Sequence, residues 1–300
     1  SRPGLYSGDV VEVCGSSGSG KTEVLMHAVA HVLVVPDSVP NDRQKRVSES
    51  TIAMGSDDDG SDQGSGAHED QVNVGPAREG AAVPKQVVWM DHDGRLDVAR
   101  LSSILRHRVK AVNPQLAAVG LEERVSEALE LVSVVRCAST FEAVAALQVL
   151  HVEIKGGNRE TLVVVDSIGA MHFMDRQTEL VAGEGAALAG PLVRQVSKLL
   201  KERPVLVLAA KPSLFKPRRG QAFEHREYLP PGWQQLVVAR LCLAKRSSQK
   251  SAQKGAKKRR EEPPAPAVFD MWVSKDHSGQ AIGRTRAFSV AGPGIVRPED

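Results

Sequence analysis

The chain has 300 residues, of which 41% are hydrophobic and 25% charged, and its formal net charge is +3. This length can bury a substantial core in one or two domains, and the 26 glycines and 17 prolines exclude a collagen-like or wholly disordered chain. The longest apolar runs fall far short of the ~20 residues that a membrane helix needs, and no basic and then apolar leader opens the sequence, so we expect neither membrane insertion nor secretion.

Short apolar runs predict the strands of a sheet, in the order Val10–Cys14, Val87–Met90, Leu131–Val135, Leu162–Val165, Val205–Ala209 and Leu236–Leu243. Helical patterns lie between them, with apolar residues at a spacing of about 3.6 over Leu101–Val112 and Leu188–Leu200. Strands that are apolar throughout and separated by helices indicate an α/β domain, with a mostly parallel sheet and helices on both faces. Near the carboxyl end the alternation changes, and Val268–Ser274 with Arg284–Val290 predicts an antiparallel hairpin at the edge of the sheet.

Two low-complexity segments interrupt this pattern. Residues 37–84 carry no hydrophobic period, and between Gly55 and Asp70 they contain six acids but neither lysine nor arginine. Residues 245–267 are basic and then rich in proline, with eight bases and no acid as far as Arg260. We predict that both are disordered insertions in surface loops of one domain spanning residues 1–300. When the acidic stretch Gly55–Asp70 and the basic stretch Lys245–Arg260 are both set aside, bases and acids nearly balance in the rest of the chain. The pI of about 8.8 is therefore attributed to the basic tract.

The strongest motif runs from Gly15 to Thr22 and is a complete G-x-x-x-x-G-K-[ST] match between the first strand and a helix that continues to about Val35. Backbone N–H groups of such a loop surround a phosphate, so the candidate ATP-binding residues are Gly15, Ser16, Ser17, Gly18, Ser19, Gly20, Lys21 and Thr22. We expect Lys21 to reach the β- and γ-phosphates and the Thr22 hydroxyl to bind Mg²⁺. Since only 14 residues precede the motif, the sequence is expected to be an N-terminally truncated fragment.

A second strand, Leu162–Val165, is followed by Asp166 and Ser167. A carboxylate at the carboxyl edge of a parallel strand faces the same crevice as a phosphate-binding loop. Asp166 is therefore predicted to hold Mg²⁺ through its water shell, and Ser167 to lie beside the γ-phosphate.

A third strand, Val87–Met90, ends in the acidic sequence Asp91-His92-Asp93. One interpretation is that an acid here polarises the attacking water, with Asp93 as the candidate catalytic residue. The other is that Asp93 caps the helix that follows, since aspartate is a favoured N-cap residue. Spacing alone leaves both open.

Histidines and cysteines do not indicate a further site. His27 and His31 lie four residues apart on the helix after the loop, but no other ligand for a metal can be placed beside them, so we expect ordinary helix residues. Cys14, Cys137 and Cys242 are scattered and form no metal spacing, which favours a reducing compartment.

These motifs together resemble the RecA-like recombinase superfamily, in which the phosphate loop carries Gly-Lys-Thr, the next strand ends in Asp-Thr-Glu and a later one in Asp-Ser. Within it, the chain resembles the eukaryotic recombinase paralogues. That likeness is carried by Gly8-Asp9-Val10, Gly20-Lys21-Thr22-Glu23, Met90-Asp91-His92-Asp93, Leu162–Ser167 and Gly232-Trp233-Gln234-Gln235-Leu236-Val237 with Arg240. It covers Gly8 to about Val296 and breaks at the two insertions. It implies a RecA-like P-loop NTPase core that binds ATP.

The resemblance also implies a subunit of a hetero-oligomer of recombinase paralogues. Such an assembly supports homologous-recombination repair of double-strand breaks and stalled forks in the nucleus. Active recombinases have glutamate where this chain has Asp93 and a γ-phosphate-sensing glutamine where it has Lys211, so we expect slow or no ATP hydrolysis, at most a weak DNA-dependent ATPase. The helical domain and linker of full recombinases lie outside this chain, so self-filament formation is not expected. A scaffold with a vestigial nucleotide site and a P-loop small-molecule kinase are the alternatives.

The resemblance places a DNA-facing loop after the Val205–Ala209 strand, over Lys211–Pro231. The candidate DNA contacts in it are Lys211, Lys216, Arg218 and Arg219. Bases interleaved with aromatic residues suit DNA that is single-stranded or branched, whereas the alternative is a solvated loop without a ligand. The tract Lys245–Arg260 is interpreted as a nuclear-import signal, a phosphate-binding tail or both.

Overall fold

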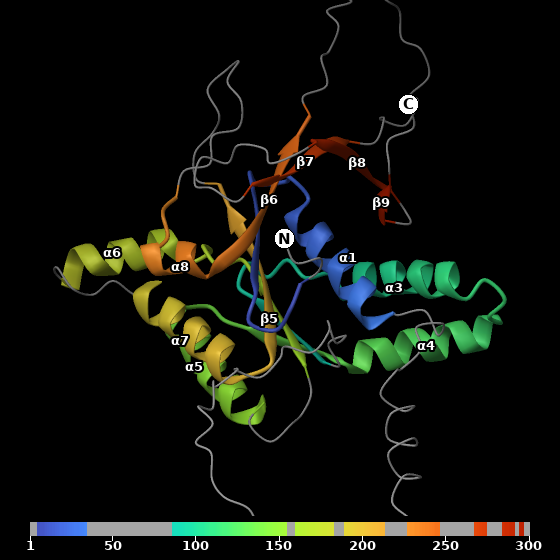
Figure 1. Ribbon diagram of the computed structural model, residues 1–300, viewed down its shortest axis with the longest axis horizontal. Helices are drawn as coiled ribbons and strands as arrows, with labels where there is room; N and C mark the ends of the chain where they lie inside the picture. Colours follow the sequence, from blue (N-terminus) through green and yellow to red (C-terminus); the bar gives the residue numbers. More distant parts are fainter. Residues whose placement is uncertain are drawn as a thin grey trace, which may run out of the picture. The chain divides into compact units, whose positions relative to one another are not determined.

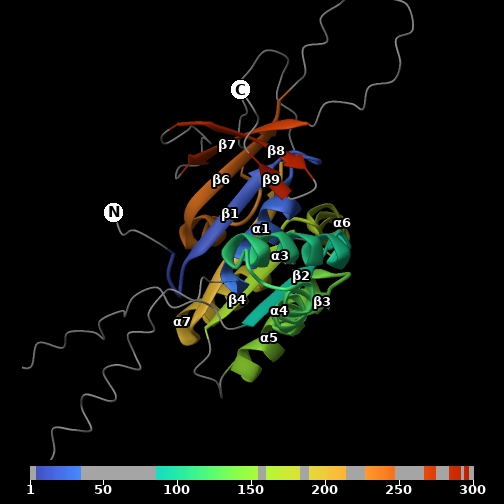
Figure 2. The same cartoon turned by 90° about the vertical axis from the view of Figure 1, so that its right-hand side faces the viewer.

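The computed structural model describes residues 5–34, 86–154, 160–182, 189–213, 227–246, 267–274, 284–291 and 294–296. These residues form a nine-stranded sheet of order β3-β2-β4-β5-β1-β6-β7-β8-β9 with helices on both sides (Figures 1 and 2). The predicted α/β class is therefore confirmed. The predicted insertions, 37–84 and most of 245–267, lie outside the described residues.

The first six strands are mutually parallel and are β1 (Val10–Gly15), β2 (Gln86–Asp91), β3 (Val132–Arg136), β4 (Thr161–Asp166), β5 (Val205–Pro212) and β6 (Val237–Lys245). Three antiparallel strands continue the sheet beyond β6, namely β7 (Val268–Ser274), β8 (Arg286–Ala291) and β9 (Gly294–Val296). The mostly parallel sheet and the carboxyl-terminal hairpin are thus confirmed. The third of these strands was not predicted, because three residues are too few to show alternation.

The helices are α1 (Lys21–Leu33), α3 (Val98–Val112), α4 (Ala118–Glu130), α5 (Thr140–Glu153), α6 (His172–Ala182), α7 (Ala189–Glu202) and α8 (Pro231–Leu236). In Figure 1, α1, α3 and α4 lie on one side of the central strands and α5 to α8 on the other. In the described part of the chain, no helix combines the length and apolar character needed to cross a membrane.

Alternate residues of the central strands enter two separate cores. In β4, Leu162 and Val164 pack in the core beneath α1, α3 and α4, whereas Val163 and Val165 pack in the core beneath α5, α7 and α8. Both faces of the strand are buried, which is why it reads as one continuous apolar run. The outer strand β3 is half-exposed, because only one of its edges has a neighbour.

The start of α3 corrects one of the two interpretations of Asp93. The N-cap residue of this helix is Asp97, whose Oδ1 accepts a hydrogen bond from the N–H of Arg100 at 3.0 Å. Asp93 lies four residues before this cap, so the interpretation as a helix cap is wrong. Periodicity could not locate the cap, because several polar residues separate the strand from the first buried helix residue, Leu101.

Candidate functional site

The Gly15–Thr22 loop joins β1 to α1, as the sequence predicts. Gly18 and Gly20 have φ angles of 72° and 87°, in the left-handed region that glycine adopts without strain. A Cβ atom on Gly15 would lie 2.5 Å from the carbonyl oxygen of Leu243 and equally close to Ser19 Oγ. The glycines are therefore required by the path of the backbone and by its close contact with β6.

Two side chains at the start of α1 are held against the loop and the neighbouring strand. The ammonium group of Lys21 donates to the carbonyl oxygens of Gly15 at 3.1 Å and Ser16 at 2.9 Å. Thr22 Oγ1 donates to Asp166 Oδ2 at 2.7 Å, although the two residues are far apart in sequence. The structure thus brings Lys21, Thr22 and Asp166 together at one end of the parallel strands.

Burial dominates the ionisation of this group. It lowers the pKa of Lys21, although the nearby carboxylate of Asp166 opposes the shift. It raises the pKa of Asp166, which is 1% exposed, against the hydrogen bond from Thr22. Both charges are therefore held in an environment that disfavours them, which is typical of functional sites.

The end of β2 lies beside the end of β4. Asp91 is paired in register with Asp166, and the backbone N–H groups of His92 and Asp93 donate to the carbonyl oxygen of Asp166 at 2.7 and 3.2 Å. Asp93 is exposed, and its carboxylate is among the causes that raise the pKa of Asp166. The structure therefore places Asp93 near the loop.

Asp91 has a different role from Asp93. Its carboxylate is buried and accepts hydrogen bonds from the backbone N–H groups of Arg95 at 3.0 Å and Leu96 at 3.4 Å. These bonds hold the turn between β2 and α3. Of the two acids, only Asp93 has an exposed carboxylate, so it stays the candidate for polarising water.

Three buried polar atoms around the loop have no hydrogen-bond partner within the described protein: Ser19 Oγ, His92 Nε2 and Ser167 Oγ. The other ring nitrogen of His92 lies 3.0 Å from the carbonyl oxygen of Ser167, and burial lowers the pKa of this histidine. Unpaired buried polar atoms are uncommon in folded proteins because each loses its bonds to water. We call the Gly15–Thr22 loop with His92, Asp93, Asp166 and Ser167 the candidate nucleotide site.

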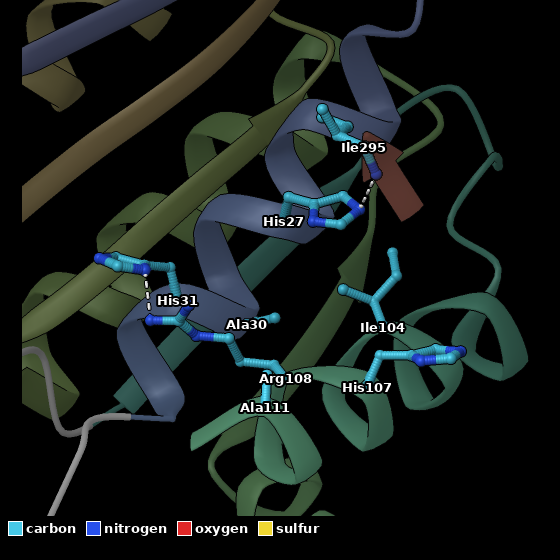
Figure 3. Close-up of a pocket in the computed structure, with 8 residues that line it drawn as sticks. All are labelled: His27, Ala30, His31, Ile104, His107, Arg108, Ala111 and Ile295. Atoms are coloured by element: carbon cyan, nitrogen blue, oxygen red, sulfur yellow. Dashed lines mark hydrogen bonds between the residues drawn. The ribbon is translucent and has the colours of Figure 1, made fainter. Parts of the chain in front are cut away.

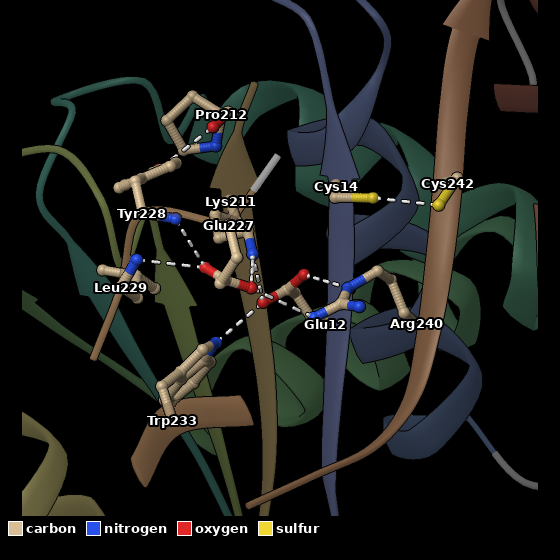
Figure 4. A network of polar contacts seen from close by, with 10 residues as sticks. All are labelled: Glu12, Cys14, Lys211, Pro212, Glu227, Tyr228, Leu229, Trp233, Arg240 and Cys242. Carbon is tan, nitrogen blue, oxygen red and sulfur yellow. Dashed lines mark hydrogen bonds and ion pairs between the residues drawn. The ribbon is translucent and has the colours of Figure 1, made fainter. Parts of the chain in front are cut away.

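A second polar cluster lies on the neighbouring strands β1, β5 and β6 (Figure 4). Glu12 is fully buried, and its carboxylate accepts hydrogen bonds from Arg240 Nε at 2.6 Å and Trp233 Nε1 at 2.7 Å. Lys211 Nζ lies 3.0 Å from Glu12 Oε2 and 2.7 Å from Glu227 Oε2, and the latter oxygen is also 3.3 Å from Arg240 Nη2. We call these five residues the charge network. Its two carboxylates balance its two cations.

The charge network corrects the prediction that Lys211 contacts DNA. The side chain is fully buried, and its ammonium group lies between two carboxylates, so it cannot reach a phosphate at the surface. Sequence reasoning treated Lys211 as the first loop residue, whereas β5 continues to Pro212. The other predicted contacts, Lys216, Arg218 and Arg219, lie outside the described residues.

Sequence reasoning did not predict that Glu12, Arg240 and Glu227 form a buried charged cluster, although Arg240 belongs to the string that carries the resemblance. A signal for the first two was present, since each is a charged residue inside an otherwise apolar strand. Charged residues are almost never fully buried unless they are paired, so two opposite charges inside two apolar runs favour a buried ion pair. Glu227 lies in no apolar run and gave no comparable signal.

No protein-family model matches the chain, but individual proteins do. It is 23% identical over 310 residues to the DNA repair protein XRCC2 homolog of Arabidopsis thaliana, covering 85% of this chain and 73% of that protein. It is 22% identical over 262 residues to the DNA repair protein XRCC2 of Mus musculus, covering 82% and 75%. It is 27% identical over 213 residues to the DNA repair protein RAD51 homolog 4 of Bos taurus, covering 68% of this chain but 46% of that relative.

These similarities confirm the resemblance to the RecA-like recombinase paralogues. One of the similar proteins is X-ray repair cross-complementing protein two, and the string Gly232–Val237 with Arg240 is the part of this sequence that resembles that paralogue. The relatives also imply that the mostly parallel sheet described above is a RecA-like fold.

Proposed function

We propose that this chain is an ATP- and Mg²⁺-binding recombinase paralogue. It acts as a subunit of a hetero-oligomer with other recombinase paralogues, in homologous-recombination repair of DNA double-strand breaks and stalled forks in the nucleus. The names of its relatives support the repair role. The nucleotide-binding role is carried by one observation, the 2.7 Å hydrogen bond that joins Thr22 at the start of α1 to Asp166 at the end of β4.

The residues of the candidate nucleotide site fit MgATP chemically. Thr22 and Asp166 offer the oxygen ligands that Mg²⁺ prefers, directly or through water. The loop and Lys21 would bind the β- and γ-phosphates, and the hydroxyl groups of Ser19 and Ser167 offer donors that have no acceptor among the described residues. Bound Mg²⁺ would neutralise phosphate charge, while the protein's own groups orient the nucleotide.

Slow or absent hydrolysis follows from two residues. Asp93 is one methylene shorter than glutamate, so its carboxylate ends about 1.5 Å short of where a glutamate would hold water, and a misplacement of ~1 Å can cost about 10²-fold in rate. Lys211 is held between Glu12 and Glu227, so its ammonium group is not available to respond to a γ-phosphate. We expect turnover well below the ~1 s⁻¹ low end of typical enzymes.

The nucleotide role is tested by titrating a fluorescent ATP analogue with Mg²⁺ into the intact chain and into Lys21→Ala. The variant should bind at least about tenfold more weakly, because the main cation facing the phosphates is lost. Lys110→Ala is the matched control, since Lys110 is an exposed lysine on α3, and its affinity should be unchanged. Equal affinity of Lys21→Ala and the intact chain would favour a scaffold with a vestigial site.

The role of Asp93 is tested by steady-state ATP hydrolysis. Asp93→Glu should raise turnover, because the longer side chain reaches the attacking water, whereas Asp93→Ala should leave ATP affinity nearly intact. Rapid hydrolysis that Asp93→Ala does not change would show that another residue is the base and that the slow-ATPase expectation is wrong.

The partners are tested by affinity purification from nuclei after DNA damage, with mass spectrometry of the bound proteins. Recombinase paralogues should co-purify, whereas enzymes of one metabolic pathway would instead favour the small-molecule kinase.

DNA binding is tested by deleting residues 247–266. The deletion should weaken non-specific DNA binding and flatten its salt dependence, since the segment contains six of the eight clustered bases. An unchanged salt dependence would leave the tract as an import signal alone.

A further inference from the structure

A pocket of about 620 Å³ lies between α1 and α3 (Figure 3). Its basic lining residues are His27, His31, His107 and Arg108, its apolar walls include Ile104 and Ile295, and none of its described lining residues is an acid. The volume lies within the range of small-molecule sites, which combine apolar walls with a few polar groups. The candidate nucleotide site, by contrast, lies at the beginning of α1, and Lys21 and His31 are separated by about 15 Å of helix rise.

Arg108 is the unusual residue of this pocket. It is half-buried, its Nη2 donates to His31 Nδ1 at 2.8 Å, and its Nε is buried without a hydrogen-bond partner among the described residues. Two other arginines of the same helix are paired with carboxylates, Arg100 with Glu23 and Arg106 with Glu122. Among the described residues, no carboxylate forms an ion pair with Arg108.

The two histidines of α1 leave further donors available. His27 Nε2 accepts a hydrogen bond from the backbone N–H of Ile295 at 2.9 Å, so the proton of the neutral ring lies on Nδ1. His31 Nδ1 accepts from Arg108, which leaves its proton on Nε2, and burial followed by the charge of Arg108 lowers the pKa of His31. A guanidinium group and two imidazole rings therefore belong to one pocket. The carboxylate beside them is that of Glu23, whose Oε1 lies 3.6 Å from His27 Nε2, but Glu23 is not a lining residue and is paired with Arg100.

Helix dipoles explain only part of this arrangement. His31 lies in the last turn of α1, where a helix favours basic side chains. The dipole does not explain why Arg108 Nε is buried without a partner, nor why apolar walls enclose the group. The negative end of the helix dipole disfavours an anion at this end of α1, but a charge-assisted hydrogen bond contributes more binding free energy than the dipole takes away at a partly exposed residue. The dipole therefore does not prevent an anion from binding here.

We propose that this pocket binds a phosphate monoester with a compact apolar body. The Arg108 guanidinium would pair with two phosphate oxygens through its terminal nitrogens, since its Nε is enclosed by the protein. A phosphate monoester has three terminal oxygens where a carboxylate has two, so one oxygen remains for another polar group of the lining. Ile104 and Ile295 would contact the apolar body.

The test uses phenyl phosphate as the probe and the intact chain, followed by NMR of the histidine rings. The variants His27→Gln and His31→Gln assign two of the nine histidines. Saturable shifts of these two rings are expected, and Arg108→Gln should weaken the affinity by about 10- to 100-fold, the equivalent of one charge-assisted hydrogen-bonded pair. Arg106→Gln, on the exposed face of the same helix, is the matched control and should bind as the intact chain does.

Further measurements distinguish binding in this pocket from binding at the candidate nucleotide site, and binding of phosphate from binding of other anions. Lys21→Ala should leave the shifts unchanged, and loss of the shifts in that variant would place the probe at the loop and overturn the proposal. Inorganic phosphate should bind more weakly than phenyl phosphate, and phenylacetate more weakly still; phenylacetate binding as tightly would overturn the phosphate assignment. If Arg108→Gln does not fold, Arg108→Lys replaces it, which keeps the charge but loses the paired geometry. Unchanged affinity in that variant would also overturn the proposal.

Discussion

The candidate nucleotide site and the charge network lie on neighbouring strands of one sheet, yet they treat buried polar atoms in opposite ways. In the charge network, each carboxylate meets two cations, and the indole N–H of Trp233 is bonded as well. In the candidate nucleotide site, Ser19 Oγ and Ser167 Oγ are buried and have no hydrogen-bond partner among the residues that the structure describes. The first cluster satisfies itself, whereas the second leaves groups that a ligand can use.

The difference separates structural from functional polarity. A buried charge without a partner is strongly destabilising, so a network that serves the fold must be complete. A binding site must leave donors and acceptors unpaired until its ligand arrives, and the rest of the fold offsets that cost. Two buried acids, Glu12 and Asp166, allow the distinction to be tested by the same change from carboxylate to amide.

The largest effect is expected for Glu12→Gln. The amide cannot balance Lys211 and Arg240, which leaves excess positive charge in the interior, so the free energy of unfolding should fall by about 3–5 kcal/mol. Urea denaturation followed by far-UV circular dichroism measures it. Glu122→Gln is the control, because that carboxylate pairs with Arg106 at the surface, and it should leave the midpoint unchanged. A loss below about 1 kcal/mol for Glu12→Gln would mean that the network is not structural.

A smaller effect of opposite sign is expected for Asp166→Asn. Burial raises the pKa of Asp166 above its ordinary 3.8, so above the raised pKa the ionised carboxylate lowers the stability of the fold. Below pH 3.8 the carboxyl group is protonated in both the folded and the unfolded chain, and this loss of stability disappears. The variant should gain up to about 1 kcal/mol at neutral pH and none in acid, while losing Mg²⁺-dependent nucleotide binding. Destabilisation at pH 7 would place Asp166 with the structural acids instead.

The smallest effect is expected for Ser167→Ala. The hydroxyl group is buried and makes no hydrogen bond to the part of the chain that the structure describes, so its removal should change the free energy of unfolding by less than about 0.5 kcal/mol. The same variant should weaken binding of the fluorescent ATP analogue if the hydroxyl serves the nucleotide. Thermal unfolding with and without the analogue measures both quantities. A marked loss of stability without ligand would mean that Ser167 has a structural partner.

Local sequence patterns determined most of the fold and the centre of the candidate site. Continuous apolar runs predicted β1, β2, β4, β5 and β6, because a strand buried on both faces cannot alternate. The spacing of the Gly15–Thr22 motif placed its loop between a strand and a helix, and the acid that ends β4 was predicted to face it. These features depend on residues close together in the chain, where composition and period carry the information.

Only the tertiary structure decided where charges are buried and what they meet. The sequence predicts that Lys211 begins a basic loop, whereas in the structure its ammonium group lies between the carboxylates of Glu12 and Glu227, which are distant from each other in the sequence. Arg108 looks like Arg100 and Arg106 on the same helix, yet it is the one of these three without a carboxylate partner in the described part of the chain. The energy of a charge depends on its burial and its partners, and both are set by contacts that no local pattern contains.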